Sequence, residues 1–167
     1  MTNAIRILGL DPGLRRTGWG VVAADGARLS YVAHGVVAPD DKLELSERLL
    51  VLFQGVGEVV GRHRPDEAAV EETFATANGA STLKLGHARA AAMIAPAVAG
   101  LPVAEYAAKV VKKALVGAGG ADKAQVAFMV ARLLPAAGRV EGDAADALAV
   151  AICHAHARTM RRLRMAS

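Results

Sequence analysis

Cysteine, aromatic residues and long hydrophobic runs are all scarce in this sequence of 167 residues. The single cysteine, Cys153, excludes an internal disulfide and fits a reducing compartment. No stretch approaches the length of a membrane span, and Met1–Leu10 lacks the long apolar core of a signal peptide. No Walker-type loop and no paired Cys/His motif of a zinc site occurs. We therefore expect a cytoplasmic protein that makes no use of a membrane, a P-loop or a zinc site.

Small apolar residues and positive charge are what the sequence has in quantity. Hydrophobic residues make up 53% of the chain and 37 residues are alanine, so close helix contacts between small side chains should supply much of the core. The net charge of +4 suits a polyanionic partner, because basic groups that neutralise phosphates release counterions. The length suits one compact domain. We predict a single domain over residues 1–167, with a basic C-terminal tail from about residue 158.

Three strand-like segments open the chain. The apolar run Ile5–Leu10 is typical of a buried central strand. Trp19–Ala24 and Ala27–Val37 are two more strand-like runs, and Asp25-Gly26 between them is a strong hairpin signal. Shorter strands are predicted at Glu67–Glu71 and Leu101–Val103.

Helical patterns fill the rest of the chain. Apolar residues recur at three- and four-residue intervals from Leu45 to Val60, with Asp41 as the candidate N-cap. Asp122 and Gln125 have the spacing of a capping box. Further helices are expected over Ala80–Ala99, over Glu105–Leu115, from Asp122 to Leu133 and from Asp143 to about Arg158. The order of elements predicts an α/β fold in which helices pack on a mixed sheet.

Acidic residues stand at the ends of several of these segments. Asp11 follows the first strand in an Asp-Pro-Gly sequence, which is also ordinary turn chemistry. Glu71 ends a later strand and is expected to lie near the sheet, whereas Glu72 is expected to point away from it. Both could also be solvated acids at a strand end. Asp143 and Asp146 share one face of the last helix, but an N-cap followed by an acid that favours the helix dipole has the same spacing.

Together the four carboxylates predict a metal site. If the strands that end at Asp11 and Glu71 are neighbours, the two side chains can approach each other, and the last helix can lay Asp143 and Asp146 across them. Carboxylates this close raise one another's pKa, and divalent cations relieve the repulsion. Oxygen ligands select magnesium or manganese.

The sequence resembles a known protein family. Leu8-Gly9-Leu10-Asp11-Pro12-Gly13 and Thr17-Gly18-Trp19-Gly20-Val21 resemble the opening of the RuvC family of Holliday-junction resolvases. The similarity runs from about Ile7 to His156. The Asp-Pro-Gly opening is shared with the wider superfamily, but the whole set in one order is specific. Other matching motifs include Ala69-Val70-Glu71 with Phe74, Leu83-Lys84-Leu85-Gly86, Ala88-Arg89, Glu105-Tyr106-Ala107-Ala108, Lys123 with Gln125-Val126, and Asp143-Ala144-Ala145-Asp146.

This resemblance implies an RNase H-like α/β fold, a mixed five-stranded sheet with helices on both faces, and a homodimer. It implies that Asp11, Glu71, Asp143 and Asp146 are catalytic and bind two Mg²⁺ ions, with Mn²⁺ as a substitute, although some family members carry histidine in place of Asp143. The implied activity is that of a crossover junction endodeoxyribonuclease, which nicks two strands of like polarity in four-way junction DNA and leaves 5′-phosphate ends. Cooperation with the branch-migration complex of RuvA and RuvB is implied as well.

Five further residues are candidates for DNA binding. Lys112 and Lys123 resemble the family's basic positions near the scissile strand and would position phosphates, although Lys112 also fits a solvated helix face. Lys84 and Arg89 are additional candidates. Phe74 stands in a polar loop, where a ring can fold back on the core or stack on an unpaired base, and the resemblance favours stacking. We expect Phe74→Ala to weaken junction cutting and to leave the fold intact.

Other interpretations stay open at the level of sequence. A nuclease of the same superfamily that acts on RNA or on simple duplex would share the acids without needing Phe74 or a dimer. A domain that binds branched DNA without cutting is disfavoured because all four acids are present, and a sugar-kinase-like ATPase because the chain is short. The Ala-rich segment Ala88–Ala99 is a candidate dimer face, with packing on the sheet as its alternative. The histidines are predicted to be structural or exposed.

Overall fold

A computed structural model describes residues 4–72 and 77–165 of the chain. Five strands and five α-helices lie within these ranges, together with a short 3₁₀ turn, Pro135–Ala137. The strands are β1 (Ile5–Asp11), β2 (Thr17–Asp25), β3 (Arg28–Val37), β4 (Glu67–Glu72) and β5 (Val103–Ala107). The helices are α1 (Leu45–His63), α2 (Gly79–Val98), α3 (Ala108–Val116), α4 (Lys123–Leu133) and α5 (Gly142–Met165).

The strands form one sheet in the order β3-β2-β1-β4-β5, which confirms the expected mixed five-stranded sheet. Strands β1, β2 and β3 are antiparallel neighbours, while β4 pairs with β1, and β5 with β4, in parallel. The β2–β3 hairpin closes through Gly26 and Ala27, between the paired residues Asp25 and Arg28. Gly26 has a φ of +59°, a conformation that glycine adopts without a steric penalty.

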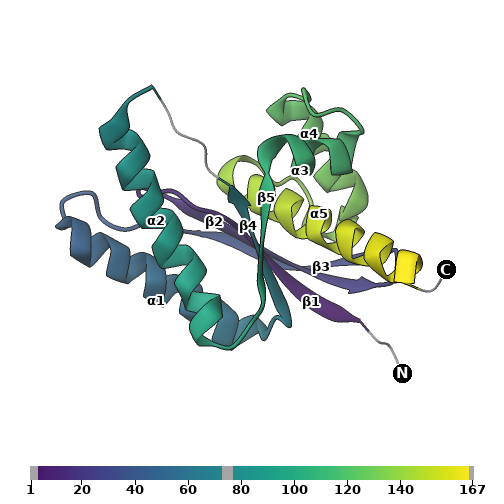
Figure 1. The fold of residues 1–167 in the computed structure, drawn as a ribbon, viewed down its shortest axis with the longest axis horizontal. Helices are drawn as coiled ribbons and strands as arrows, with labels where there is room; N and C mark the ends of the chain where they lie inside the picture. Colours follow the sequence, from purple (N-terminus) through teal and green to yellow (C-terminus); the bar gives the residue numbers. More distant parts are fainter. Residues whose placement is uncertain (1–3, 73–76, 166–167) are drawn as a thin grey trace.

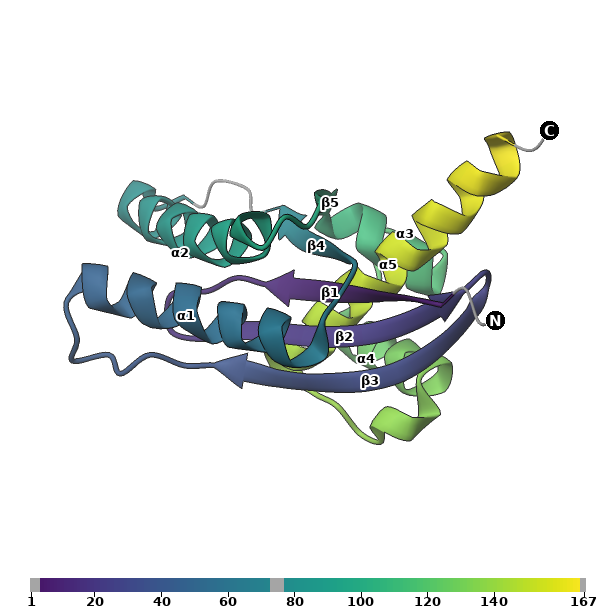
Figure 2. The ribbon, with the colours of Figure 1, turned by 90° about the horizontal axis from the view of Figure 1, so that it is seen from below.

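Helices cover both faces of the sheet, as expected (Figures 1 and 2). Helices α1 and α2 pack against each other on one face, and α5 lies across β1 and β2 on the other, with α3 and α4 beside it. Because successive strand residues point to opposite faces, Ile7 belongs to the core under α5, whereas Leu8 and Leu10 belong to the core under α1 and α2. The same alternation places Ala69 under α5 and Val70 under α1 and α2.

Helix α5 lies directly on the backbone of β1 and β2. A Cβ atom built on Gly9 would lie 2.0 Å from the carbonyl oxygen of Ala147, and one built on Gly20 would lie 2.6 Å from the Leu148 side chain. A side chain at either strand position would therefore push the helix away from the sheet. The glycines of these two strands are what permits the close contact.

Three sequence-based predictions about elements are wrong. Glu44, and not Asp41, caps α1, because a capping box links Glu44 with Glu47. Glu105 lies in β5, and not in a helix, because the chain pairs with β4 as far as Ala107. Helix α5 continues past Arg158 to Met165, so the basic C-terminal run is helical.

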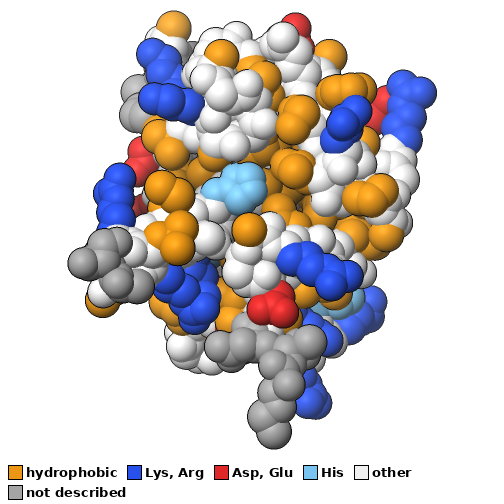
Figure 3. Space-filling model, turned by 90° about the vertical axis from the view of Figure 1, so that its right-hand side faces the viewer, with side chains coloured by type: hydrophobic (Ala, Val, Ile, Leu, Met, Phe, Trp, Pro, Cys, Tyr) orange, Lys and Arg blue, Asp and Glu red, His pale blue; other side chains and the backbone are white. Residues whose placement is uncertain are grey.

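The side of the molecule that carries α3, α4 and the end of α5 keeps apolar side chains at its surface. Figure 3 shows hydrophobic side chains gathered around a histidine on this side, with lysine and arginine side chains around them. Large exposed hydrophobic residues on these elements are Val110, Phe128, Met160, Leu163 and Met165. None of the helices in residues 4–72 and 77–165 is long and apolar enough to cross a membrane.

Candidate active site

Two of the four carboxylates stand at the ends of neighbouring parallel strands. Leu10 of β1 pairs with Val70 of β4, and Asp11 and Glu71 follow these two residues directly. By alternation, both acids point to the face that α5 covers, the same face as Ile7 and Ala69. The expected approach of Asp11 and Glu71 is therefore confirmed, and both line one hollow.

The first turn of α5 brings the other two carboxylates onto this strand end. Single carboxylate oxygens of Asp11, Asp143 and Asp146 all lie within 4.8 Å of one another. The close approach of α5 makes this possible, because a Cβ atom on Gly18, which pairs with Asp11, would lie 2.0 Å from the carbonyl oxygen of Asp143. Three of the four acids therefore form a close cluster, and Glu71 lines the same hollow as Asp11 and Asp146.

The carboxylates of this cluster concentrate negative charge in a partly buried part of the molecule. Burial, followed by the negative charges of Glu71, Asp146 and Asp143, raises the pKa of Asp11 from 3.8 to about 8. Burial and the charge of Asp146 also raise the pKa of Glu71. Carboxyl groups whose ionisation is this costly are stabilised by cations close to them.

Two basic side chains already lie against the cluster. Lys123 Nζ is 3.2 Å from Asp146 Oδ2, and the charge of Asp146 raises the pKa of this lysine. Arg16 Nε is 2.9 Å from Asp143 Oδ2. Lys112 lines the same hollow, and its charge acts to lower the pKa of Glu71, although burial and the charge of Asp146 outweigh it. Both predicted phosphate-positioning lysines therefore lie beside the acids.

The hollow itself has a volume of about 200 Å³ and opens between β1, β4, α3, α4 and α5. Its floor is acidic and its α3 and α4 sides carry the two lysines. The lining residues are Asp11, Glu71, Ala108, Val111, Lys112, Lys123, Val126, Asp146 and Ala149.

Arg16 is the site residue that the sequence analysis missed. It stands in the loop between β1 and β2, and its partner Asp143 is 127 residues away in the chain. The signal that could have found it is its position a few residues after Asp11, in a loop that must leave the strand end where the acids gather. Two successive arginines, Arg15 and Arg16, follow the Asp-Pro-Gly turn.

The remaining DNA-binding candidates lie elsewhere or have other partners. The Arg89 guanidinium forms an ion pair with Glu105 and donates a hydrogen bond to the backbone oxygen of Glu71, at 3.4 Å. Lys84 lies in a separate hollow beside α1 and α2. Phe74 lies outside the described residues. Their proposed contacts with DNA stay predictions.

The cluster suits a hard divalent cation. Its ligand atoms are carboxylate oxygens, the donors that magnesium and manganese prefer, and no histidine or cysteine belongs to it among the residues that the structure describes. A cation bound there would also offset the repulsion that raises the pKa of Asp11. The residues present therefore fit divalent metal ions.

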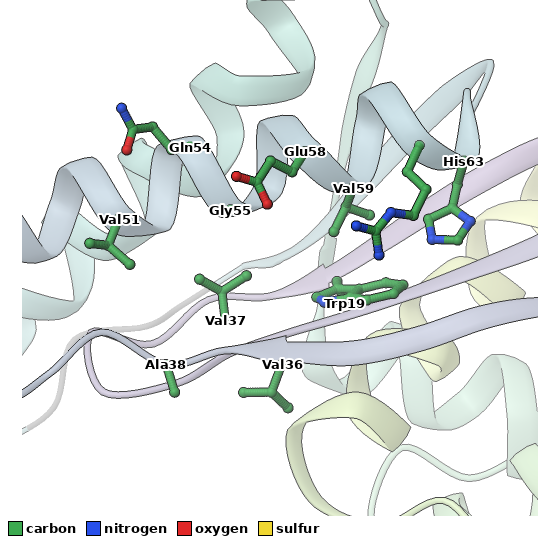
Figure 4. Close-up of a pocket in the computed structure, with 11 residues that line it drawn as sticks. Trp19, Val36, Val37, Ala38, Val51, Gln54, Gly55, Glu58, Val59 and His63 are labelled. Carbon is green, nitrogen blue, oxygen red and sulfur yellow. The ribbon is translucent and has the colours of Figure 1, made fainter.

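A hollow larger than the acidic one lies away from the acids, between α1 and the β2–β3 edge of the sheet. Its volume is about 440 Å³. Figure 4 shows Trp19 and Val37 facing α1 from the sheet, with Glu58 and His63 on the helix side. The rings of Trp19 and His63 are 5.5 Å apart. With Glu58 as its single lining acid among the described residues, this hollow offers no cluster for metal chemistry.

The most buried histidine has a structural environment. His154 of α5 is 3% exposed, and its ring nitrogens lie 2.8 Å from Tyr106 Oη and 2.6 Å from Glu67 Oε2. Arg158 Nε donates to the other Glu67 oxygen at 2.9 Å. Burial acts to raise the pKa of Glu67, but the hydrogen bonds from His154 and Arg158 outweigh it and lower the pKa. This network ties α5 to β4 and β5, away from the four acids.

Comparison with protein families gives one match that spans most of the chain. Residues 7–154 match the family described as "Crossover junction endodeoxyribonuclease RuvC". A curated protein with this name from Caulobacter sp. (strain K31) is 67% identical over 158 residues, which cover 95% of this chain and 94% of the relative. Another, from Azorhizobium caulinodans, is 60% identical over 168 residues, covering 100% of this chain and 99% of the relative.

Solved structures with the same fold include two junction resolvases. The fold is similar to that of Thermus thermophilus RuvC in complex with a Holliday junction substrate, with a TM-score of 0.87 and 35% identity over 94% of this chain and 96% of the other. The yeast mitochondrial Holliday junction resolvase Ydc2 has a TM-score of 0.67 at 10% identity, over 93% of this chain and 82% of the other, and shows the fold alone. The expected RNase H-like α/β fold is thereby confirmed.

Proposed function

The chain belongs to the RuvC family of crossover junction endodeoxyribonucleases, and we propose that it resolves Holliday junctions by nicking two strands of like polarity. Its substrate is four-way junction DNA in homologous recombination and DNA repair. The observation that carries this proposal is the convergence of Asp11, Asp143 and Asp146 within 4.8 Å, beside Glu71 and two lysines. This arrangement offers a divalent metal site next to groups that can hold a phosphate.

The four acids are the proposed catalytic and metal-binding residues. Asp11 is close to the other three acids, because the charges of Glu71, Asp146 and Asp143 all raise its pKa, so it would be a ligand of the metal ions. Glu71, Asp143 and Asp146 would complete the coordination of the two ions, with Mg²⁺ as the expected metal and Mn²⁺ as a substitute. When bound, two such ions lower the pKa of an attacking water and stabilise the leaving oxygen.

The basic residues around the acids have a separate task. The ammonium groups of Lys112 and Lys123 line the hollow, where they can hold non-bridging oxygens of the scissile phosphate and offset charge that develops on it. Lys123 and Arg16 now pair with Asp146 and Asp143. The side chains of Lys123 and Arg16 are 84% and 61% exposed, so either can exchange its carboxylate partner for a phosphate or water without repacking of the core.

A homodimer would match the two-fold relation of the two strands that are cut. Part of the Ala-rich segment expected as the dimer face packs inside the protomer, because Ala88, Ala92 and Ala95 are buried there. The outer surface of α2 instead carries exposed large side chains: Leu83, Ile94 and Val98. These residues support α2 as the dimer face. Cooperation with RuvA and RuvB remains part of the proposal through the family alone.

The proposed activity is tested by the choice of substrate. A synthetic four-way junction, a linear duplex of the same sequence and an RNA–DNA hybrid are incubated with the protein and Mg²⁺ or Mn²⁺. We expect paired nicks at symmetric positions in the junction, with 5′-phosphate ends, and slow or no cutting of the other two. Equal cutting of the duplex or the hybrid would contradict junction resolution and favour a general nuclease.

A further inference from the structure

A second basic hollow lies beside the active-site loop, on the opposite face of the sheet from α5. We propose that Arg15, Arg48 and Lys84 bind a backbone phosphate of the DNA strand that enters the active site. This inference rests on the proposed function and adds to it a substrate contact away from the scissile phosphate.

Three separate segments supply the hollow, which has a volume of about 410 Å³. The loop after β1 supplies Arg15, α1 supplies Arg48, and the first two turns of α2 supply Lys84. No acidic residue is among its lining residues, which are Leu14, Arg15, Arg48, Ser81, Lys84 and Leu85. Three cations therefore share a concave surface that no acidic side chain lines among the described residues, and the positive N-terminal end of the α2 dipole adds to the same sign.

Among the cations of this hollow, Arg48 is held by the protein itself but is not paired with an acid in the described ranges. One of its terminal nitrogens donates to the backbone oxygen of Leu14 at 3.1 Å. Its Nε is buried without a hydrogen-bond partner, and within the described ranges its guanidinium forms no ion pair. Buried polar groups are ordinarily paired, and a partly buried charge without a counterion is unfavourable. An anion in the hollow would offset this positive charge.

The loop between β1 and β2 joins the hollow to the catalytic acids. Arg16 reaches Asp143 of α5 on one side, while its neighbour Arg15 lines the hollow with α1 and α2 on the other. The loop is braced, because the Thr17 hydroxyl donates to the Gly13 backbone oxygen at 2.9 Å and accepts from the Gly13 nitrogen at 3.2 Å. These hydrogen bonds hold the backbone of the loop from which Arg15 and Arg16 extend to opposite sides.

This geometry matches a single strand of nucleic acid better than a small anion. Phosphates recur along each strand of duplex DNA at roughly 3.4 Å of helix axis. In the proposed path, a strand whose scissile phosphate is bound beside Asp11 and Asp146 would carry a further phosphate past the loop to Arg15 and Lys84. A contact of this kind fixes the register of the strand without reading its sequence.

The test is the salt dependence of junction binding. Arg15→Gln with Lys84→Gln removes two exposed charges and keeps Arg48, which braces the loop. The matched control is Arg28→Gln with Arg164→Gln, which removes two exposed charges at the far end of the sheet, where Thr159 of α5 contacts the hairpin residue Gly26. Equilibrium binding of a four-way junction is measured without Mg²⁺ over a range of salt concentrations, after unfolding midpoints have shown that both variants fold.

We expect the Arg15/Lys84 variant to bind about tenfold more weakly than wild type, with a slope of log K against log salt that is smaller by about one. The control should keep the wild-type slope. Wild-type affinity and slope in the Arg15/Lys84 variant would overturn the site, and so would an equal loss in the control, because that would reflect net charge alone. Cutting of the junction by wild type with Mg²⁺ is scored separately, so failure of the proposed function is distinguishable from failure of this site.

Discussion

A Cβ atom on Gly18 would lie 2.0 Å from the carbonyl oxygen of Asp143, so the first turn of α5 rests directly on the backbone of β2. Gly18 is also the residue that pairs with Asp11 across the two strands. The contact therefore sets the distance between Asp143 on α5 and Asp11 on β1. The proposed metal site therefore depends on the absence of a side chain at Gly18 as well as on the carboxylates.

Gly18→Ala should lift the start of α5 and separate Asp143 from Asp11. We expect Mn²⁺ affinity, measured by calorimetry, to fall about tenfold or more, and the free energy of unfolding to fall by about 1–3 kcal/mol. Gly57→Ala in α1 is the matched control, because a Cβ there meets nothing within 4 Å. That control should keep its metal affinity and gain about 0.5–1 kcal/mol of stability. Unchanged metal binding in Gly18→Ala would contradict the account of the close contact.

The metal-free protein should lose stability as pH rises through the range set by Asp11. The folded protein holds the Asp11 proton up to about pH 8, whereas the unfolded chain releases it near pH 3.8, so unfolding becomes easier between these values. In the presence of a chelator, Asp11→Asn should unfold about 5 °C above wild type at pH 8 and show little difference at pH 4. Thermal unfolding followed by circular dichroism measures both, with Asp25→Asn in the exposed hairpin as the control. A difference in unfolding temperature that does not change with pH would show that folding does not raise the pKa of Asp11.

Lys123→Gln should slow cleavage of saturating junction DNA by about 100-fold, because it removes a cation that can stabilise charge on the transferring phosphate. The ammonium lies 3.2 Å from Asp146, and its pKa is raised, so the lysine stays charged. Lys113→Gln, on the exposed side of α3 and outside the hollow, is the paired control and should cut at the wild-type rate. The comparison uses single-turnover kinetics with Mg²⁺. A wild-type rate for Lys123→Gln would remove this lysine from the mechanism.

Arg89→Gln separates two roles for one arginine. Because Arg89 pairs with Glu105 and donates to the backbone of Glu71, we expect it to position Glu71, so its loss should weaken Mn²⁺ binding by about 10- to 100-fold. The salt slope of junction binding should stay unchanged. If Arg89 instead contacts DNA, as the sequence analysis predicted, the slope would fall by about one and metal affinity would survive.

The sequence predicted those parts of the site that depend on local signals and on strand order. Asp11 and Glu71 could be placed because each ends a short apolar strand, and Asp143 and Asp146 because their spacing puts them on one face of a helix. The capping box of α4 was predicted from Asp122 and Gln125 alone, and the structure has it.

What could not be predicted depends on contacts between distant segments. Arg16 joins the site through a residue 127 positions away, and Gly18 matters only because α5 lies against it. Glu105 was assigned to a helix because the short edge strand β5 runs straight into α3. The choice of Glu44 over Asp41 as N-cap depends on where the loop turns into the helix, which nearby acids alone do not determine.

The most direct test of the central claim is cleavage of a synthetic four-way junction by wild type and by Asp11→Asn, with Mg²⁺ or Mn²⁺, at concentrations where both proteins bind the junction. The substitution keeps the shape of the side chain and removes the carboxylate at the centre of the cluster. The account predicts symmetric nicks by wild type and a rate at least about 100-fold lower for the variant. Cleavage by Asp11→Asn at the wild-type rate would contradict it.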